Sequence, residues 1–165
     1  VACSASSVAL QPPRAQPSSP PESSTLHEPM DDLYRDEILE HYREPHNFGT
    51  LDAPDASYEG HNPLCGDRIT MMLIFDGSGT VSDVAFSGRG CAISQASASM
   101  LTDEVKGRPV TEIEAMTNQD ILDLLGIEIS PARLKCALLS LDTMQRALEE
   151  RGDKEATTEA PEVSA

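Results

Sequence analysis

The sequence predicts an α+β domain: an N-terminal helix, a small antiparallel three-stranded sheet, and C-terminal helices packed on that sheet. Two observations carry this prediction. A buried apolar run precedes a turn-forming segment at 76–79 and apolar alternation follows it, and an apolar stripe with helical spacing lies near the C-terminal end. Because aromatic residues make up only 4% of the chain and Trp is absent, the core is expected to consist of aliphatic side chains and Met.

The first helix is expected to begin at Asp31 or Asp32, since either side chain can cap a helix N-terminus. Its predicted apolar stripe comprises Leu33, Tyr34, Ile38 and Tyr42. Pro45 and Gly49 then end the helix.

Three strands follow in the prediction. The first is a short strand over 57–60, and the second is a buried strand over 68–75. Asp, Gly and Ser at 76–79 supply turn chemistry, and a third strand returns over 80–86. The last two strands are therefore predicted to form a hairpin.

Helices are expected over 93–106, 111–116 and 118–125. Ser130-Pro131 indicates the start of one more helix, because a capping residue precedes a proline at the first helical position. This last helix is predicted to run to about Arg151, with a buried stripe formed by Leu134, Leu138, Leu141, Met144 and Leu148.

The predicted domain occupies residues 30–151. Residues 1–29 are rich in Pro and Ser and are interpreted as a disordered N-terminal extension, with Met30 as the simplest start of translation. Residues 152–165 are interpreted as a disordered acidic tail.

The charge balance excludes whole classes of partner. The chain has 28 acidic and 12 basic residues, a formal net charge of -16, which argues against a nucleic-acid groove or an anionic membrane surface. No stretch reaches the roughly 18 consecutive apolar residues of a membrane span. A cytoplasmic protein is expected.

Three cysteines within the predicted domain carry the chemistry: Cys65, Cys91 and Cys136. They form no C-x-x-C pair, which excludes a zinc-ribbon knuckle and a thioredoxin dithiol. An odd number of thiols also argues against a disulfide framework. The fourth cysteine, Cys3, lies in the N-terminal extension.

All three thiols are predicted at the ends of elements, where they could converge. Asp67 follows Cys65 by two residues and adds a carboxylate. Three thiolates and one carboxylate suit a tetrahedral zinc ion or a small iron–sulfur cluster. Two alternatives remain open from the residues alone. The cysteines could be inert core residues, and Asp67 a turn residue paired at the surface with Arg68.

The histidines His41, His46 and His61 are assigned capping or surface roles rather than ligation.

Three local motifs resemble those of the IscU/NifU-type iron–sulfur assembly proteins. These are Asn62-Pro63-Leu64-Cys65-Gly66-Asp67, then the segment from Gly88-Arg89-Gly90-Cys91 to Met100, and Pro131-Ala132-Arg133-Leu134-Lys135-Cys136-Ala137. The first helix and its Pro45-His46-Asn47 end are similar as well, so the resemblance covers nearly all of residues 30–150. The Lys135-Cys136 pair is similar to the SufU branch, whereas the short stretch from Lys106 to Ser130 is IscU-like in length.

The resemblance implies a zinc site formed by Cys65, Asp67, Cys91 and Cys136. It further implies that Cys65 accepts persulfide sulfur from a SufS-type cysteine desulfurase, which uses pyridoxal phosphate, and passes it to cluster assembly or apo-proteins. Arg133 and Lys135 are expected to support the thiolate by adding positive charge near Cys136.

Two other functions are kept beside sulfur transfer. One is a scaffold on which a [2Fe–2S] cluster is built, held by Cys65, Cys91 and Cys136 with iron in place of zinc. The other is a structural zinc domain or interaction module. In the first two roles the protein is a sulfur acceptor or scaffold rather than an enzyme acting on a small-molecule substrate.

Overall fold

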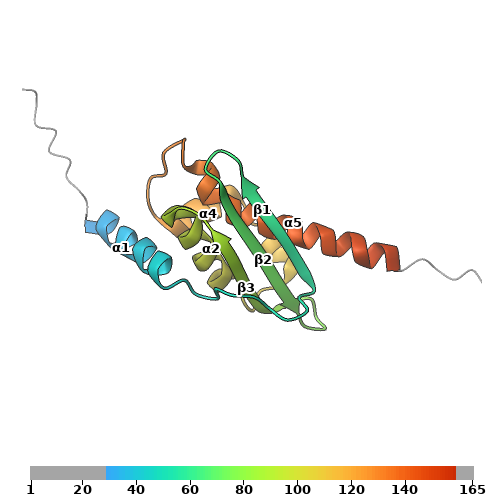
Figure 1. Cartoon of the computed structure of the whole chain (residues 1–165). Coiled ribbons are helices and arrows are strands. Elements are labelled where there is room, and N and C mark those ends of the chain that lie inside the picture. The colour runs from blue at the N-terminus through green and yellow to red at the C-terminus, as the bar shows by residue number, and fades with distance from the viewer. Residues whose placement is uncertain (1–28, 159–165) are drawn as a thin grey trace, which may run out of the picture.

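The computed structural model describes residues 29–158 and confirms the predicted α+β class (Figure 1). The interpretation of residues 1–28 and 159–165 lies outside the described residues. The elements are α1 (Pro29–Arg43), β1 (Ala56–Asn62), β2 (Asp67–Phe75), β3 (Val81–Arg89), α2 (Ala92–Val105), α3 (Val110–Glu114), α4 (Asn118–Leu125) and α5 (Leu134–Thr158). Within this range no helix is long and apolar enough to cross a membrane.

The sheet has the strand order β1-β2-β3, and both pairings are antiparallel. β2 is the central strand, and it carries Ile69, Met71 and Leu73 into the core at alternate positions. α2 and α5 lie together on one face of the sheet, with α5 against β1 and α2 against β3 (Figure 1). The sheet and these two helices are the two layers that enclose the core.

The core consists of aliphatic side chains and Met, as the composition predicts, with Phe86 as its largest fully buried side chain. α5 approaches β1 very closely because Gly60 has no side chain. A Cβ atom at Gly60 would lie 1.9 Å from Thr143 Oγ1 on α5. Small residues on α2 permit a similar approach to α5, where Ser97 Oγ donates to the Ala137 carbonyl at 2.7 Å.

The predicted stripe of α1 is partly wrong. Leu33 and Tyr42 are 64% and 46% exposed, whereas Ile38 and His41 are buried and Tyr34 is half-buried. α1 begins at Pro29, before the predicted caps, and it lies at the edge of the domain against α2 (Figure 1). A helix that packs on one neighbour buries only a narrow face, and here that face is Tyr34, Ile38 and His41.

α5 also differs from its prediction at both ends. Residues 131–133 form a turn instead of the first helical residues, because the N–H groups of Arg133 and Leu134 both donate to the Ser130 carbonyl. The helix begins at Leu134 and continues to Thr158, beyond the predicted end at Arg151. Of its predicted stripe, Leu141, Met144 and Leu148 are buried, while Leu134 and Leu138 are half-buried.

Candidate metal centre

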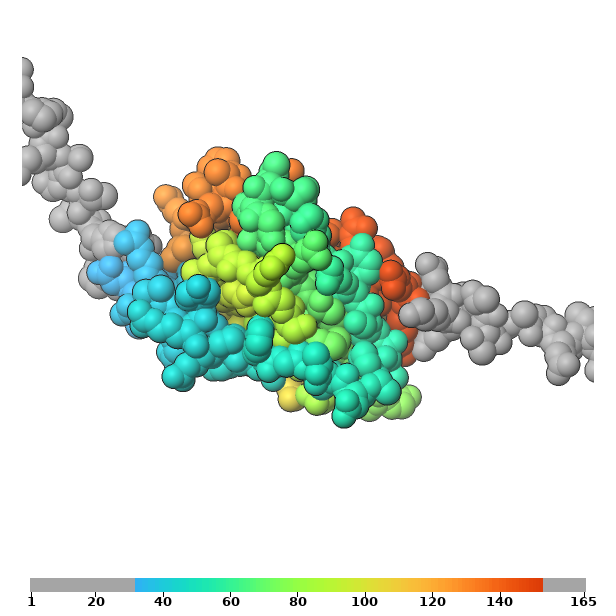
Figure 2. Space-filling model, in the orientation of Figure 1, coloured from blue at the N-terminus to red at the C-terminus, as the bar shows by residue number. Residues whose placement is uncertain are grey.

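The three cysteines and Asp67 meet at one end of the sheet. Cys65 lies in the turn between β1 and β2, Asp67 begins β2, Cys91 precedes α2, and Cys136 lies in the first turn of α5. Figure 2 shows the green tip of the β1–β2 hairpin beside the orange segment that leads into α5. Together they border a cavity of about 600 Å³, lined by Cys65, Gly66, Asp67, Arg89, Gly90, Cys91, Ala132, Arg133 and Cys136.

Three of the four predicted ligands are in close contact. Cys65 Sγ lies 3.0 Å from Cys136 Sγ, and the ligand atoms of Cys65, Asp67 and Cys136 all lie within 4.8 Å of one another. Cys91 lines the same cavity without joining this closest group. Cys65 is exposed, Cys91 is half-buried and Cys136 is buried, so the thiols differ sharply in their access to a partner.

Asp67 is buried with an unsatisfied oxygen. The residue is 4% exposed, and its Oδ2 atom has no hydrogen-bond partner among the described residues. A buried carboxylate oxygen without a partner is costly, and a bound cation would satisfy it. Because thiolates and a carboxylate are ligands that zinc accepts in tetrahedral sites, the residues present fit a divalent cation.

The alternative role for Asp67, a surface pair with Arg68, is wrong. Arg68 Nη1 instead lies 3.6 Å from Glu59 Oε1, and both side chains are exposed. The carboxylate of Asp67 is on the cavity side, whereas Arg68 is exposed. The alternation of side chains along β2 separates the two neighbours.

Burial raises the pKa of the Cys136 thiol, and nearby Cys65, Asp67 and Cys91 raise it further. Each of these causes raises the pKa of Cys136, which is the opposite of the thiolate support expected from Arg133 and Lys135. Without a metal this thiol stays protonated at neutral pH, so a cation has to displace its proton.

The two basic residues near Cys136 have different surroundings. Arg133 lines the thiol cavity. Lys135 lines a separate neighbouring cavity of about 250 Å³ together with Leu64 and Leu138. Because they face different cavities, only Arg133 is placed to act on charge that develops among the thiols.

Sequence reasoning missed Asn62 as a functional residue. Asn62 is buried, its Nδ2 donates to Cys136 Sγ at 3.6 Å, and its Oδ1 accepts from the Leu64 N–H at 3.1 Å. The Asn62 side chain thus stabilises the turn that contains Cys65 and also contacts the thiol of Cys136. The sequence signal that could have identified Asn62 is its position at the start of the first cysteine motif.

Two glycines give this end of the sheet its shape. Gly66 has a φ of +73°, a left-handed conformation that allows the tight turn between Cys65 and Asp67. At Gly90, a Cβ atom would lie 2.3 Å from Ser94 Oγ and 3.0 Å from Asp67 Cγ. The absence of a side chain at this position lets the chain before Cys91 approach the aspartate.

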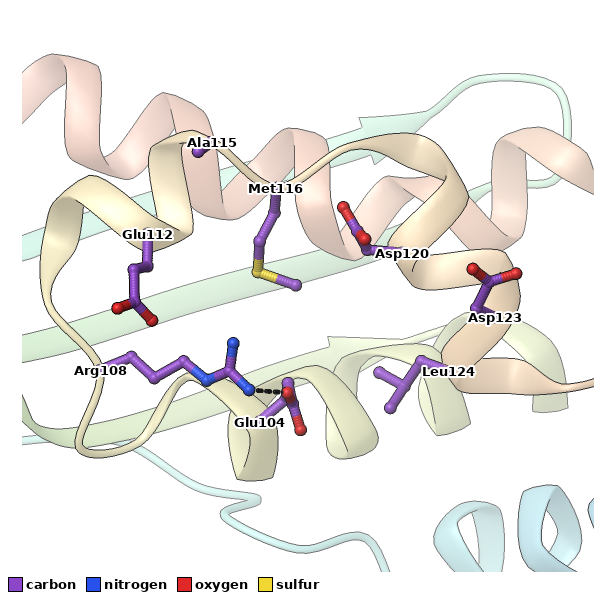
Figure 3. A pocket seen from close by; sticks show the side chains of 8 residues that line it. All are labelled: Glu104, Arg108, Glu112, Ala115, Met116, Asp120, Asp123 and Leu124. Carbon is purple, nitrogen blue, oxygen red and sulfur yellow. Dashed lines mark hydrogen bonds and ion pairs between the residues drawn. The ribbon is translucent and has the colours of Figure 1, made fainter.

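A second cavity, of about 440 Å³, contains no thiol. Its lining residues are Glu104, Arg108, Glu112, Ala115, Met116, Asp120, Asp123 and Leu124. Figure 3 shows Met116 and Leu124 among acidic side chains, with Arg108 paired to Glu104. This cavity lies between α2, α3 and α4 and shares no lining residue with the thiol cavity.

Similarity to known proteins places this α+β fold, with three cysteines and an aspartate at one end of its sheet, among the iron–sulfur cluster assembly proteins that serve as scaffolds or in sulfur transfer. The family model for the NifU-like N terminal domain matches residues 33–158, and the chain belongs to this family.

Individual relatives agree with this assignment. The chain is 37% identical over 143 residues to the zinc-dependent sulfurtransferase SufU of Bacillus subtilis, covering 75% of this chain and 96% of that protein. It is 31% identical over 149 residues to the iron–sulfur cluster assembly scaffold protein IscU of Streptococcus pyogenes, covering 79% and 91%. Among solved structures, a nitrogen-fixing NifU-like protein (N-terminal) from Brucella abortus matches with a TM-score of 0.62 and 28% identity, covering 75% and 97%.

Proposed function

We propose that this protein accepts persulfide sulfur from a SufS-type cysteine desulfurase at Cys65 and passes it to iron–sulfur cluster assembly. The observation that carries the proposal is the contact between one exposed thiol and one buried thiol. Cys65 is accessible to a partner, and its Sγ lies 3.0 Å from that of Cys136, which is 1% exposed.

In this proposal Cys65, Asp67, Cys91 and Cys136 hold zinc, which when bound keeps the thiols deprotonated and quenches their reactivity. Cys136 and Asp67 are buried and anchor the set, and Asn62 Nδ2 donates to the Cys136 sulfur. Cys65 is the exposed member, in a turn preceded by the 73%-exposed Leu64. It is therefore the ligand that can leave and meet another protein.

The transfer step is a thiol–persulfide exchange. The Cys65 thiolate attacks the terminal sulfur of the desulfurase persulfide, the sulfur–sulfur bond of that persulfide breaks, and the desulfurase cysteine departs as a thiolate. Cys65 then carries the persulfide as an anion. Arg133 lines the same cavity and stabilises this charge. A thiolate of the recipient repeats the attack on the terminal sulfur and regenerates Cys65.

The positions of the two bases lead to unequal roles. Arg133 lines the thiol cavity, so Arg133→Ala should slow sulfur acceptance more than Lys135→Ala does. Lys135 lies in the adjacent cavity beside Leu64, so Lys135→Ala should leave sulfur acceptance close to that of the native chain.

The test uses the zinc-loaded full chain with a SufS-type desulfurase and cysteine. We expect faster alanine formation in the presence of the chain, and mass spectrometry should find one added sulfur atom on the peptide that contains Cys65. Cys65→Ser should remain folded by circular dichroism and lose both effects. Absence of stimulation by the zinc-loaded protein would refute the proposal, and unfolding of Cys65→Ser would favour a purely structural metal site.

A scaffold role for a [2Fe–2S] cluster is the second candidate, favoured by the three cysteines that line one cavity. Cys65, Cys91 and Cys136 all line it, and thiolates are the ligands that hold iron–sulfur clusters. Anaerobic reconstitution with iron and sulfide should then produce visible absorbance that Cys65→Ser abolishes. Protein that stays colourless after reconstitution would exclude this role.

A further inference from the structure

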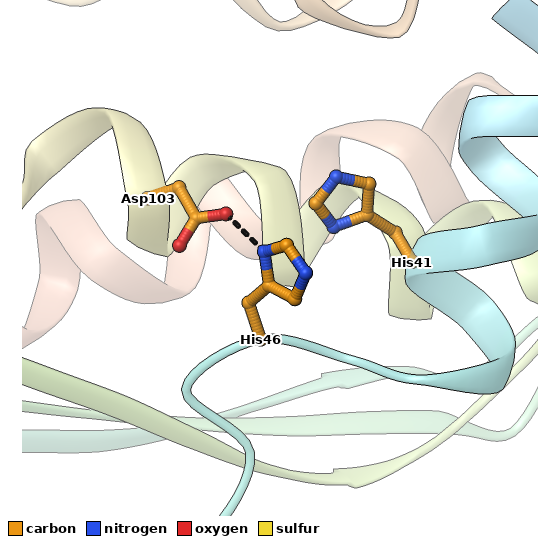
Figure 4. A group of neighbouring side chains, drawn as sticks. All are labelled: His41, His46 and Asp103. Atoms are coloured by element: carbon orange, nitrogen blue, oxygen red, sulfur yellow. Dashed lines mark hydrogen bonds and ion pairs between the residues drawn. The ribbon is translucent and has the colours of Figure 1, made fainter.

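We propose that His41, His46 and Asp103 form a second metal site, for a divalent cation of borderline softness such as Zn²⁺, Fe²⁺ or Co²⁺. His41 lies near the end of α1, His46 in the segment after it, and Asp103 on α2. Figure 4 shows the two imidazoles and the carboxylate gathered on one side of α2. One ligand atom from each of the three residues lies within 4.8 Å of the other two.

A single buried hydroxyl group positions both histidines. Ser99 Oγ lies 2.8 Å from His41 Nδ1, and it accepts a 2.8 Å hydrogen bond from the backbone N–H of His46. Ser99 is fully buried and His41 is 9% exposed. Hydrogen bonds from neighbouring groups orient metal-binding histidines in proteins, and Ser99 fixes the His41 imidazole before any ion binds.

The carboxylate is held in the same manner. Asp103 Oδ2 lies 2.6 Å from His46 Nδ1, while its Oδ1 accepts a 2.8 Å hydrogen bond from Asn47 Nδ2. Asn47 has a left-handed φ of +54°, which directs its amide back toward α2, where it also donates to Thr102 Oγ1 at 3.1 Å. His41 and Asp103 therefore each have their orientation set by a residue outside the proposed ligand set, Ser99 and Asn47.

The two imidazole rings lie close together without stacking. Their centroids are 4.5 Å apart and their planes meet at 57°. A bound cation would replace the proton between His46 Nδ1 and Asp103 Oδ2, and that proton would leave to solvent. His46 and Asp103 are 50% and 44% exposed, so an ion can enter and water can complete its coordination.

The donor set distinguishes this site from the thiol cavity. Two imidazole nitrogens and one carboxylate oxygen suit Zn²⁺, Fe²⁺ or Co²⁺, whereas a thiolate set favours softer ions and clusters. α2 separates the two sites, because Cys91 lies at its start and Asp103 near its end. At 1.5 Å per residue they are about 18 Å apart along the helix, so each can be filled independently.

The test loads the full chain with one equivalent of zinc at the thiol site and titrates it with Co²⁺. We expect a second ion to bind, measured by calorimetry, with visible d–d absorption and without the intense thiolate-to-cobalt charge-transfer bands. His46→Gln and Asp103→Asn should each weaken this second binding at least tenfold. Both side chains are half exposed, so these variants should fold.

His61→Gln is the matched control, since His61 is an exposed histidine outside the cluster, and it should bind the second ion as the native chain does. Absence of a second ion, charge-transfer bands from thiolate, or unchanged binding in both His46→Gln and Asp103→Asn would each overturn the proposal. The result is independent of sulfur transfer, because no desulfurase is present.

Discussion

Asp67 shows most directly how a single residue prepares the thiol site. Its carboxylate is 4% exposed, and Oδ2 has no hydrogen-bond partner among the described residues. Without a metal this buried, unsatisfied oxygen lowers the stability of the protein, and a bound cation would take it as a ligand. The metal-free fold is therefore expected to be slightly less stable, with a carboxylate already positioned for a cation.

Asp67→Ala tests this account. We expect the metal-free variant to be more stable than the native chain by about 1 to 3 kcal/mol, because an unsatisfied buried group is removed. The rise in melting temperature on adding zinc should shrink, because one ligand is lost. Urea unfolding and thermal melts, each with and without zinc, measure both effects.

Asp142→Ala is the matched control, since Asp142 forms an exposed pair with Arg146 and should change stability little. A metal-free Asp67→Ala protein less stable than the native chain would contradict the account.

At the scale of elements, α1 is held against α2 and the C-terminal cap of α4. Ile38 is its buried aliphatic residue, and the ring of Tyr34 lies against Gly126 at the C-terminal cap of α4. Gly126 has a left-handed φ of +61°, and a Cβ atom there would lie 2.3 Å from the Tyr34 ring. Gly126 thus provides the left-handed residue that caps α4, and its lack of a side chain leaves room for Tyr34 of α1.

Gly126→Ala should therefore destabilise the protein and loosen α1. The left-handed backbone alone costs about 1 kcal/mol for a residue with a Cβ atom. Gly107→Ala carries the same backbone strain, at φ +83°, with no atom near the added methyl group. We expect the larger loss of stability, and faster hydrogen exchange in α1, only for Gly126→Ala. Equal effects of the two substitutions would show that the Tyr34 contact contributes nothing.

The start of α4 makes stability sensitive to acid. The backbone N–H and the hydroxyl group of Thr117 both donate to Asp120, at 2.6 and 2.8 Å, and these hydrogen bonds lower the pKa of that carboxyl group. A lowered pKa means that the stabilisation is present above the ordinary value of about 3.9 and is lost as the pH falls through the folded-state value.

Asp120→Ala should accordingly be less stable than the native chain near neutral pH, and the difference should narrow below about pH 4. Chemical unfolding across a pH series measures it. Asp123→Ala, an exposed change on the same helix, is the control. A difference that grows toward acid would contradict the assigned role of Asp120.

On the scale of the whole molecule, the formal net charge of -16 opposes folding through self-repulsion. The ion pairs described, such as Lys106 with Asp83, lie at the surface and offset little of this repulsion. Raising the salt concentration from about 0.01 to about 1 M shortens the Debye length from about 30 to about 3 Å, so repulsion is screened.

We therefore expect the melting temperature to rise by several degrees over this range of potassium chloride in metal-free protein. The control measures the melting temperature in an uncharged solute at the same osmolality. A rise seen only with salt is then due to charge screening and not to excluded volume. A constant or falling melting temperature would show that repulsion is unimportant in the folded chain.

Local signals determined much of the fold in advance. The hairpin of β2 and β3 was predictable because alternation and turn chemistry act between near neighbours in sequence. The face of α1 was not, because it depends on a neighbour, α2, that lies further on in the sequence, as in the contact between His41 and Ser99, which are 58 residues apart. The cluster of His41, His46 and Asp103 was not predicted for the same reason, because Asp103 is far from the two histidines in sequence and the three form no local motif.

For the thiol site, the sequence by itself identified Cys65, Asp67, Cys91 and Cys136 from their motifs and their order. Only the tertiary structure decided which of them meet, which is exposed and which is buried. Cys65 and Cys136 are 71 residues apart, and their 3.0 Å contact exists because the β1–β2 turn and the start of α5 are brought to one end of the sheet. Composition and spacing are local properties, whereas burial and contact arise from the packing of distant elements.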